Sequence, residues 1–251
     1  MKDEDLRHHK SPGRKGSFSQ DRLDKIYEEL RNRICVLIYK PGTVLREHDL
    51  AQSFGVSRTP IRQVLQRLQF EGLVAAKKGV GTIVTGFNLD SLKNAYEVRL
   101  KVTEWVGELS QRRYGPADTE EMGTLLQRAQ ALRHNRDPQE YWNICNALHE
   151  ILGRVIVNNT LRSLYDLLYY QTARSWFQLV TEIWEKNVDL MCSEIADELK
   201  SMQIGDIRGV LLARRNHIML FLSLVDSYLD GASEGLLSVE ISSANLALRM
   251  N

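Results

Sequence analysis

Residues 47–71 constrain the fold of this chain more than any other part of the sequence. Apolar residues at helical spacing predict a short helix from about Glu47 to Phe54, and Gly55 then allows a tight turn. Ser57 is a type of residue that caps helices, and it precedes a second helical pattern that runs to about Glu71. Two short helices joined by a glycine turn are typical of a helix-turn-helix.

A further helix is predicted before this unit, from about Asp21 to a turn at Pro41-Gly42. Its apolar stripe comprises Leu23, Ile26, Tyr27, Leu30, Ile34 and Leu37. The apolar set of the helix after Gly55 comprises Ile61, Val64, Leu65, Leu68 and Phe70. Both sets are predicted to face inward.

The spacing of apolar residues changes from that of a helix to that of a strand after Gly72. Residues 73–76 and 82–85 predict two short strands, and the loop between them contains Gly79 and Gly81. Three helices followed by a β-hairpin have the order of a winged helix-turn-helix.

The chain beyond Phe87 predicts helices and no further strands. Seven segments favour a helix: 89–113, 118–135, 137–157, 159–172, 175–186, 187–204 and 206–229. Asp118 or Thr119 is expected to cap the second of them, Asp137 the third, and Gly205-Asp206 to end one helix and cap the next. The fold class is therefore mostly α, with an N-terminal winged helix-turn-helix and an all-α helical bundle.

Four ranges follow from these patterns. We predict a flexible basic tail over 1–19, the winged helix-turn-helix over 20–86, the helical domain over 87–231 and a C-terminal tail over 232–251. The first 86 residues carry 16 Lys/Arg and 10 Asp/Glu, whereas the remaining residues carry 17 and 22. A basic front half and an acidic back half are expected when only the front half meets a polyanion.

Composition excludes several classes of protein. No stretch approaches the roughly 18 apolar residues of a membrane span, and the N-terminus does not resemble a signal peptide, so we expect a cytoplasmic protein without a membrane partner. The three cysteines, Cys35, Cys145 and Cys192, are widely spaced, which predicts buried thiols rather than a disulfide framework.

Basic and polar residues occupy the positions at which a helix-turn-helix approaches DNA. The helix after the glycine turn begins with residues suited to base edges and phosphates, and the hairpin tip carries lysines beside a glycine. The predicted DNA contacts are Arg46, His48, Ser57, Arg58, Thr59, Arg62, Lys77, Lys78 and Gly79. A basic amphipathic helix beside a hairpin is the structural alternative, but it does not account for helix, turn, helix and wing in this order.

The same region resembles the DNA-binding domain of the GntR family of bacterial regulators. The resemblance covers residues 20–86 almost continuously and is carried by 40–51, 54–62, 64–68 and 71–74. It implies that Arg58, Thr59, Arg62 and the wing-tip Gly79 contact DNA. His48 stands where relatives often carry arginine.

The helical region resembles the FCD domain of the FadR-like subfamily, a helical bundle that encloses an effector pocket. The matching residues are Tyr96-Glu97-Val98-Arg99, His149, Asn158, Leu161, Gly205-Asp206 and His217. The resemblance implies that Arg99 holds an effector carboxylate, which suits a guanidinium, although a structural ion pair is the alternative for this residue. His149 and His217 would bind the effector with Asn146 and Trp142, the latter being otherwise a core residue.

Many FCD domains bind a divalent metal through one Asp and three His. Here the Asp position holds Cys145, and one His position holds Ile195, whose side chain cannot donate to a metal. We therefore favour no metal cofactor, with zinc held by Cys145, His149 and His217 as the alternative.

The combined prediction is a homodimeric transcription regulator, a repressor, that binds a palindromic operator in double-stranded DNA and responds to a small anionic metabolite. An alternative keeps the regulator and changes the effector to a metal, an acyl-CoA or a larger cofactor-like molecule. A second alternative is an enzyme or ligand-binding protein that uses the winged domain for assembly. No nucleophile–base spacing, phosphate loop or HExxH motif supports catalysis, so we predict that the chain is not an enzyme.

Overall fold

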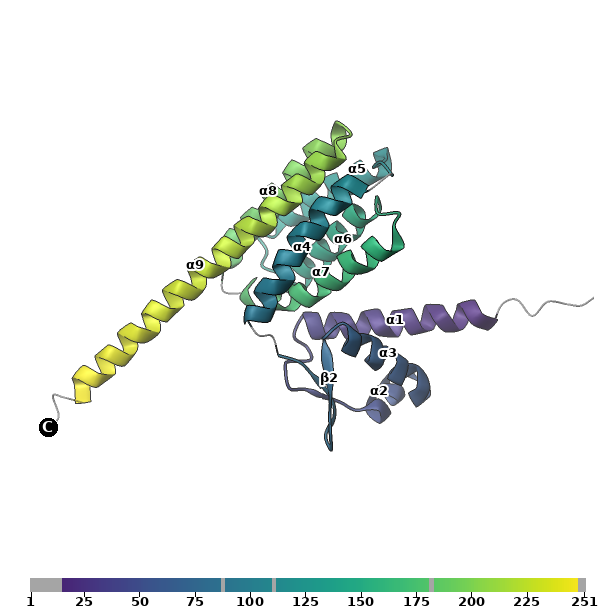
Figure 1. Cartoon of the computed structure of the whole chain (residues 1–251). Helices are drawn as coiled ribbons and strands as arrows, with labels where there is room; N and C mark the ends of the chain where they lie inside the picture. Colours follow the sequence, from purple (N-terminus) through teal and green to yellow (C-terminus); the bar gives the residue numbers. More distant parts are fainter. Residues whose placement is uncertain (1–14, 87–88, 110–111, 181–182, 248–251) are drawn as a thin grey trace, which may run out of the picture. The chain divides into compact units, whose positions relative to one another are not determined.

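The computed structural model describes residues 15–86, 89–109, 112–180 and 183–247, drawn in colour in Figure 1. They divide into two compact units, one up to Gly86 and one beyond it. The predicted tail over 1–19 lies mostly outside the described residues, but its last five residues already belong to the first helix.

The first unit combines three helices with a small antiparallel sheet (Figure 1). Its helices are α1 (Lys15–Cys35), α2 (Glu47–Phe54) and α3 (Arg58–Phe70). Its strands are β1 (Val44–Leu45), β2 (Val74–Lys77) and β3 (Gly81–Val84), in the order β1-β3-β2. The predicted helix-turn-helix and hairpin are therefore present. The sequence analysis missed β1, because two residues are too few to show the alternation of a strand.

The turn between α2 and α3 depends on Gly55, whose φ of 60° lies in the left-handed region. Ser57 occupies the position before α3, but its side chain makes no capping hydrogen bond. The first helix ends at Cys35, before the Pro41-Gly42 turn that we expected to end it, and Leu37 has a φ of 60°. Leu37 therefore does not extend the helical stripe.

The core of the first unit joins α1, α3 and the sheet. Leu30, Ile34, Ile61 and Leu68 are all fully buried in it. The prediction that Phe70 faces inward is wrong, since this side chain is 83% exposed. At 3.6 residues per turn, a position two residues after Leu68 points to the opposite side of the helix.

The second unit consists of helices throughout its described residues (Figure 1). They are α4 (Leu89–Leu109), α5 (Pro116–Ala131), α6 (Pro138–Gly153), α7 (Asn159–Val180), α8 (Trp184–Gln203) and α9 (Ile207–Ala247). The closest packing joins α8 with α9, α4 with both α7 and α9, and α5 with α8. The mostly α fold class is confirmed.

The helices of the second unit depart most from the predicted boundaries at two places. The predicted break near residue 174 is absent, because α7 continues to Val180, and 175–186 forms no helix of its own. The last helix continues to Ala247, into the range expected to be a tail. Neither segment contains a proline, so the chain has no residue there that forces a helix to end.

In the second unit, helix capping follows the sequence in two places and departs from it in one. Asp137 accepts hydrogen bonds from the backbone N–H groups of Gln139 and Glu140, both at 3.0 Å, and Asp206 accepts one from Gly209 at 2.9 Å. By contrast, α5 begins at Pro116, so Asp118 lies inside the first turn and accepts from the Gly115 N–H at 2.8 Å. In the part of the chain that the structure describes, no helix has the length and apolar character needed to cross a membrane.

The contrast between Leu68 and Phe70 gives a test of the first unit's packing. We expect Leu68→Ala to lower the free energy of unfolding by about 2–5 kcal/mol, because it removes a fully buried side chain and leaves a cavity. Phe70→Ala should change it by less than about 0.5 kcal/mol, as expected for an exposed site. Chemical denaturation of both variants measures the difference, and equal losses would contradict this packing.

Candidate nucleic-acid interface and ligand cavity

The start of α2, the start of α3 and the β2–β3 hairpin carry the residues predicted to contact DNA. Every predicted contact residue is exposed: Arg46, His48, Ser57, Arg58, Thr59, Arg62, Lys77, Lys78 and Gly79. Gly79 has a φ of 78° and open space around its Cα, so the wing tip is narrow. The buried residues Ile61 and Leu68 hold the opposite face of α3 against the core.

Two residues at the start of α2 contact the arginines of α3. Glu47 accepts two hydrogen bonds from Arg62, from Nε at 3.0 Å and from Nη2 at 2.8 Å. These bonds lower the pKa of the Glu47 carboxyl, so it is ionised at neutral pH. The Nδ1 atom of His48 lies 3.5 Å from Nη2 of Arg58. The sequence analysis did not identify Glu47, since nothing in the residue order pairs position 47 with position 62.

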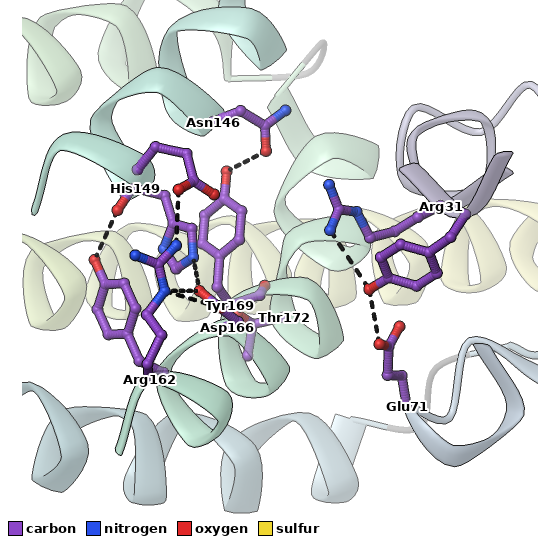
Figure 2. A network of polar contacts seen from close by, with 11 residues as sticks. Arg31, Glu71, Asn146, His149, Arg162, Asp166, Tyr169 and Thr172 are labelled. Atoms are coloured by element: carbon purple, nitrogen blue, oxygen red, sulfur yellow. Dashed lines mark hydrogen bonds and ion pairs between the residues drawn. The ribbon is translucent and has the colours of Figure 1, made fainter. Parts of the chain in front are cut away.

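Side chains of α1 fix the two ends of the helix-turn-helix. Arg22 donates to the carbonyl oxygens of Phe54 and Gly55 at 3.2 and 2.9 Å, which satisfies the C-terminus of α2. Tyr27 donates to Glu71 at 2.7 Å, just beyond the end of α3 (Figure 2). Burial raises the pKa of Tyr27 to about 12, so its hydroxyl remains a donor. The apolar stripe of α1 contains Tyr27, but the residue order does not indicate this contact with Glu71.

The helical unit contains a cavity of about 70 Å³ between α4, α6, α7, α8 and α9. Its polar lining consists of Arg99, Tyr141, Cys145, Tyr169, Asn187, Glu194, Arg214 and His217, with Tyr96 and apolar side chains completing the wall. Two predicted effector residues, Arg99 and His217, therefore line the cavity. Trp142, Asn146 and His149 do not.

Arg99 reaches the cavity from α4. Its Nη1 donates to the hydroxyl of Thr172 at 2.9 Å, and its guanidinium lies 5.6 and 5.5 Å from the ring centres of Tyr96 and Tyr169. Among the described residues, no carboxylate lies within ion-pair distance of it. The alternative of a structural ion pair is therefore not what the geometry shows.

His149 is a core residue, with 2% of its surface exposed. Its ring stacks between Tyr165 and Tyr169, with ring centres 4.3 and 3.9 Å away, and its Nε2 lies 2.8 Å from an Asp166 oxygen (Figure 2). Burial lowers the pKa of His149 to about 4, so the imidazole is neutral at pH 7 and donates to the carboxylate. Arg162 contacts the same carboxylate at 2.9 Å.

Asn146 and Trp142 also contact protein groups rather than the cavity. Asn146 accepts a hydrogen bond from the Tyr169 hydroxyl at 3.2 Å (Figure 2). Trp142 is 1% exposed and packs beside Tyr169 and Phe177, which is the core alternative considered for it. Both side chains support the wall that Tyr169 forms.

The donor set does not fit a metal ion. Cys145 and His217 line the cavity, but the Nε2 atom of His149 is engaged by Asp166, and Ile195 is fully buried without a donor atom. Among the described residues, no group of three His, Cys, Asp or Glu side chains is arranged to hold a metal. Of the three residues in the zinc alternative, Cys145 and His217 line the cavity and His149 does not.

A buried charged cluster forms one side of the cavity. Arg214 contacts Glu194 at 2.5 Å and Glu198 at 3.3 Å, and Glu198 is fully buried. Burial raises the pKa of Glu198 well above its usual range. The Nδ2 atom of Asn187 and the Nδ1 atom of His217 are buried without a hydrogen-bond partner among the described residues. Sequence analysis missed this cluster, although Glu194 and Glu198 share one helix face.

Comparison with known proteins assigns the first unit. The model of the family described as "Bacterial regulatory proteins, gntR family" matches residues 23–84. The chain is 29% identical over 147 residues to the uncharacterised HTH-type regulator YdhC of Bacillus subtilis, an alignment that covers 57% of this chain and 64% of YdhC. It is 30% identical over 144 residues to the gluconate operon transcriptional repressor of Bacillus licheniformis, covering 56% of this chain and 57% of the repressor.

Solved structures show the same fold. McbR/YncC of E. coli aligns with a TM-score of 0.64 and 19% identity, over 83% of this chain and 98% of that one. A GntR regulator from Rhodococcus sp. RHA1 aligns with a TM-score of 0.57 and 16% identity, over 82% and 98%. Residues 23–84 thus form a winged helix-turn-helix that matches the model of the bacterial gntR regulatory protein family.

Proposed function

We propose that this chain is a transcriptional repressor that binds a palindromic operator as a homodimer and responds to a small anionic metabolite in its helical unit. The observation that carries the proposal is the exposed pair Arg58 and Arg62 on a helix whose other face is buried, within a domain that matches the gntR family. The gluconate operon repressor, which shares 30% identity over part of the chain, supports repression rather than activation of transcription.

The spacing of the two arginines supports reading of the major groove. They lie four residues apart in the first turn and a half of α3, so they share one face of the helix. A helix that enters the major groove by its N-terminus brings such residues to base edges, and arginine binds guanine O6 and N7 with two hydrogen bonds. Ser57, Thr59 and the wing lysines then contact phosphates.

The DNA-binding proposal predicts the effect of removing both arginines. Arg58→Ala with Arg62→Ala should weaken specific binding by at least about fivefold per arginine, because each base contact contributes about 1–3 kcal/mol. A gel-shift assay with sequences that the native protein selects from a randomised duplex pool measures the loss.

A matched control removes the same charge elsewhere. Arg128 and Arg133 are half-exposed arginines of the helical unit, each paired with one carboxylate. Their double alanine variant should bind the selected DNA like the native protein. Unchanged specific binding of the α3 variant would overturn the proposed role of this face.

The charge balance of the cavity supports an anionic effector. Arg214 is paired with Glu194, whereas Arg99 donates to the Thr172 hydroxyl, lies near two tyrosine rings and makes no ion pair among the described residues. A guanidinium with this environment favours a carboxylate. The volume of about 70 Å³ favours a small molecule over an acyl-CoA or another large cofactor.

The effector proposal predicts a ligand-dependent rise in thermal stability. Among lactate, malonate, gluconate and their uncharged amides, we expect at least one carboxylate to raise the Tm while its amide does not, because a ligand that binds only the folded state stabilises it. Arg99→Gln should abolish that rise. Arg215→Gln, which alters an arginine outside this cavity, should retain it. A rise that survives Arg99→Gln would contradict the proposed role of Arg99.

The homodimer is supported by an exposed apolar surface on α4 and α9. Trp105, Leu109 and Leu212 are 45%, 51% and 56% exposed. Around them lie charged residues of both signs, including Glu104 and Arg215, which form an ion pair at 2.6 Å. An apolar centre with a charged rim is the usual composition of a protein interface, and a palindromic operator requires two copies.

We expect Trp105→Glu with Leu212→Glu to convert the protein from dimer to monomer in sedimentation equilibrium, because both carboxylates would be buried at the interface. Val157→Glu alters an apolar residue of the same unit that is 56% exposed outside these helices, and it should leave the dimer intact. A native protein that sediments as a monomer, or a double variant that remains dimeric, would contradict this surface.

A further inference from the structure

We infer that Glu47 is a specificity-determining residue: its carboxylate holds the Arg62 guanidinium for base reading and disfavours DNA that this arginine does not bind. The inference rests on the proposed DNA-binding function and adds a residue that lies on the neighbouring helix, α2. It concerns how strongly the protein discriminates between sequences, not how strongly it binds DNA in general.

The geometry of the pair leaves Arg62 free to bind a base. Glu47 takes the Nε and Nη2 donors of Arg62, at 3.0 and 2.8 Å. A guanidinium has five N–H donors, so one on Nη2 and both on Nη1 remain. These form the end-on fork that guanine O6 and N7 accept. Glu47 and a guanine can therefore bind the same guanidinium at once.

Holding the side chain before binding improves discrimination. Arg62 is 61% exposed, and without a partner its long side chain would sample many rotamers and reach phosphates as well as bases. The two-point contact with Glu47 restricts it to one plane. An exposed ion pair of this kind adds little to folding stability, so a structural role does not explain it.

The negative charge of Glu47 also increases the discrimination between DNA sequences. Hydrogen bonding to Arg62 lowers the pKa of Glu47, and the ionised carboxylate lies on the side of α2 that faces the contact residues of α3. Near DNA this charge is compensated only while Arg62 keeps its orientation. A sequence that pulls Arg62 toward a phosphate leaves the carboxylate unpaired beside the polyanion, and binding to that sequence is weakened.

Arg58 provides an internal comparison. Its neighbour is His48, at 3.5 Å, and that contact is neither bidentate nor an ion pair. The two recognition arginines are therefore held differently: Glu47 hydrogen-bonds Arg62 and interacts with Arg58 only through charge, so it should affect chiefly the base pair that Arg62 reads. His48→Gln should have no comparable effect on that base pair.

The experiment compares Glu47→Gln with Asp49→Asn. Both remove one negative charge from the first turn of α2, and Asp49 is exposed and makes no ion pair with an arginine of α3 among the described residues. The native protein first selects sequences from a randomised duplex pool. Dissociation constants are then measured for a selected duplex, for its single-base variants and for a scrambled duplex.

We expect Glu47→Gln to bind the scrambled duplex more tightly and to lower the specific-to-scrambled ratio at least tenfold, with the loss concentrated at one base pair per half-site. Asp49→Asn should keep that ratio within about twofold. In an Arg62→Ala background, Glu47→Gln should change the ratio no further. The Tm of each variant confirms that folding is unchanged.

The outcomes separate the two levels of inference. If the native protein selects a sequence and Glu47→Gln keeps the native ratio, Glu47 only screens charge and the inference is overturned while the proposed function stands. If Asp49→Asn lowers the ratio equally, the effect is one of total charge and the inference is also overturned. If the native protein selects no sequence, the DNA-binding proposal itself fails, and the inference fails with it.

Discussion

The burial of one face of α3 is the constraint on which the rest of the DNA-binding surface depends. Ile61, Val64 and Leu68 lie in the same core as Leu30 and Ile34 of α1. Each fully buried aliphatic side chain contributes about 1.5–3 kcal/mol, far more than the exposed polar contacts of the same helix. Because this face cannot turn outward, the arginines on the other face must remain exposed. The buried face of α3 therefore stabilises the domain, and its exposed face is the one proposed to contact DNA.

The helical unit shows the converse arrangement, in which charge is buried. Arg214, Glu194 and Glu198 form a cluster beside a small cavity, and a second set of polar contacts joins His149, Asp166 and Arg162. Burying a charge costs free energy unless the charge is paired, so such a cluster adds little to the stability of the fold. Its main effect is to favour the one arrangement of α8 and α9 in which the charges are paired. The cluster thereby helps to fix the shape of the cavity wall.

His149 illustrates how a residue type can mislead when its surroundings are unknown. A histidine on a helix of a bundle is chemically suited to binding a metal or an organic effector. In the structure, two tyrosines stack on its ring and Asp166 accepts a hydrogen bond from its Nε2, so the ring supports Tyr169 instead of reaching the cavity itself. The tyrosines come from α7, a separate helix, and no spacing around His149 indicates them.

The sequence by itself determined the features that depend on local order. Gly55 between two helical patterns, the glycine hairpin and the basic residues at the start of α3 predicted the winged helix-turn-helix and its exposed contact face, because turn chemistry and helical periodicity act over a few residues. Only the tertiary structure decided the pairing of Glu47 with Arg62, the separation of His149 from the cavity, and the joining of Arg214 to Glu194 and Glu198. These contacts depend on which faces of the helices meet. Long-range packing decides that, and the local order of residues does not indicate it.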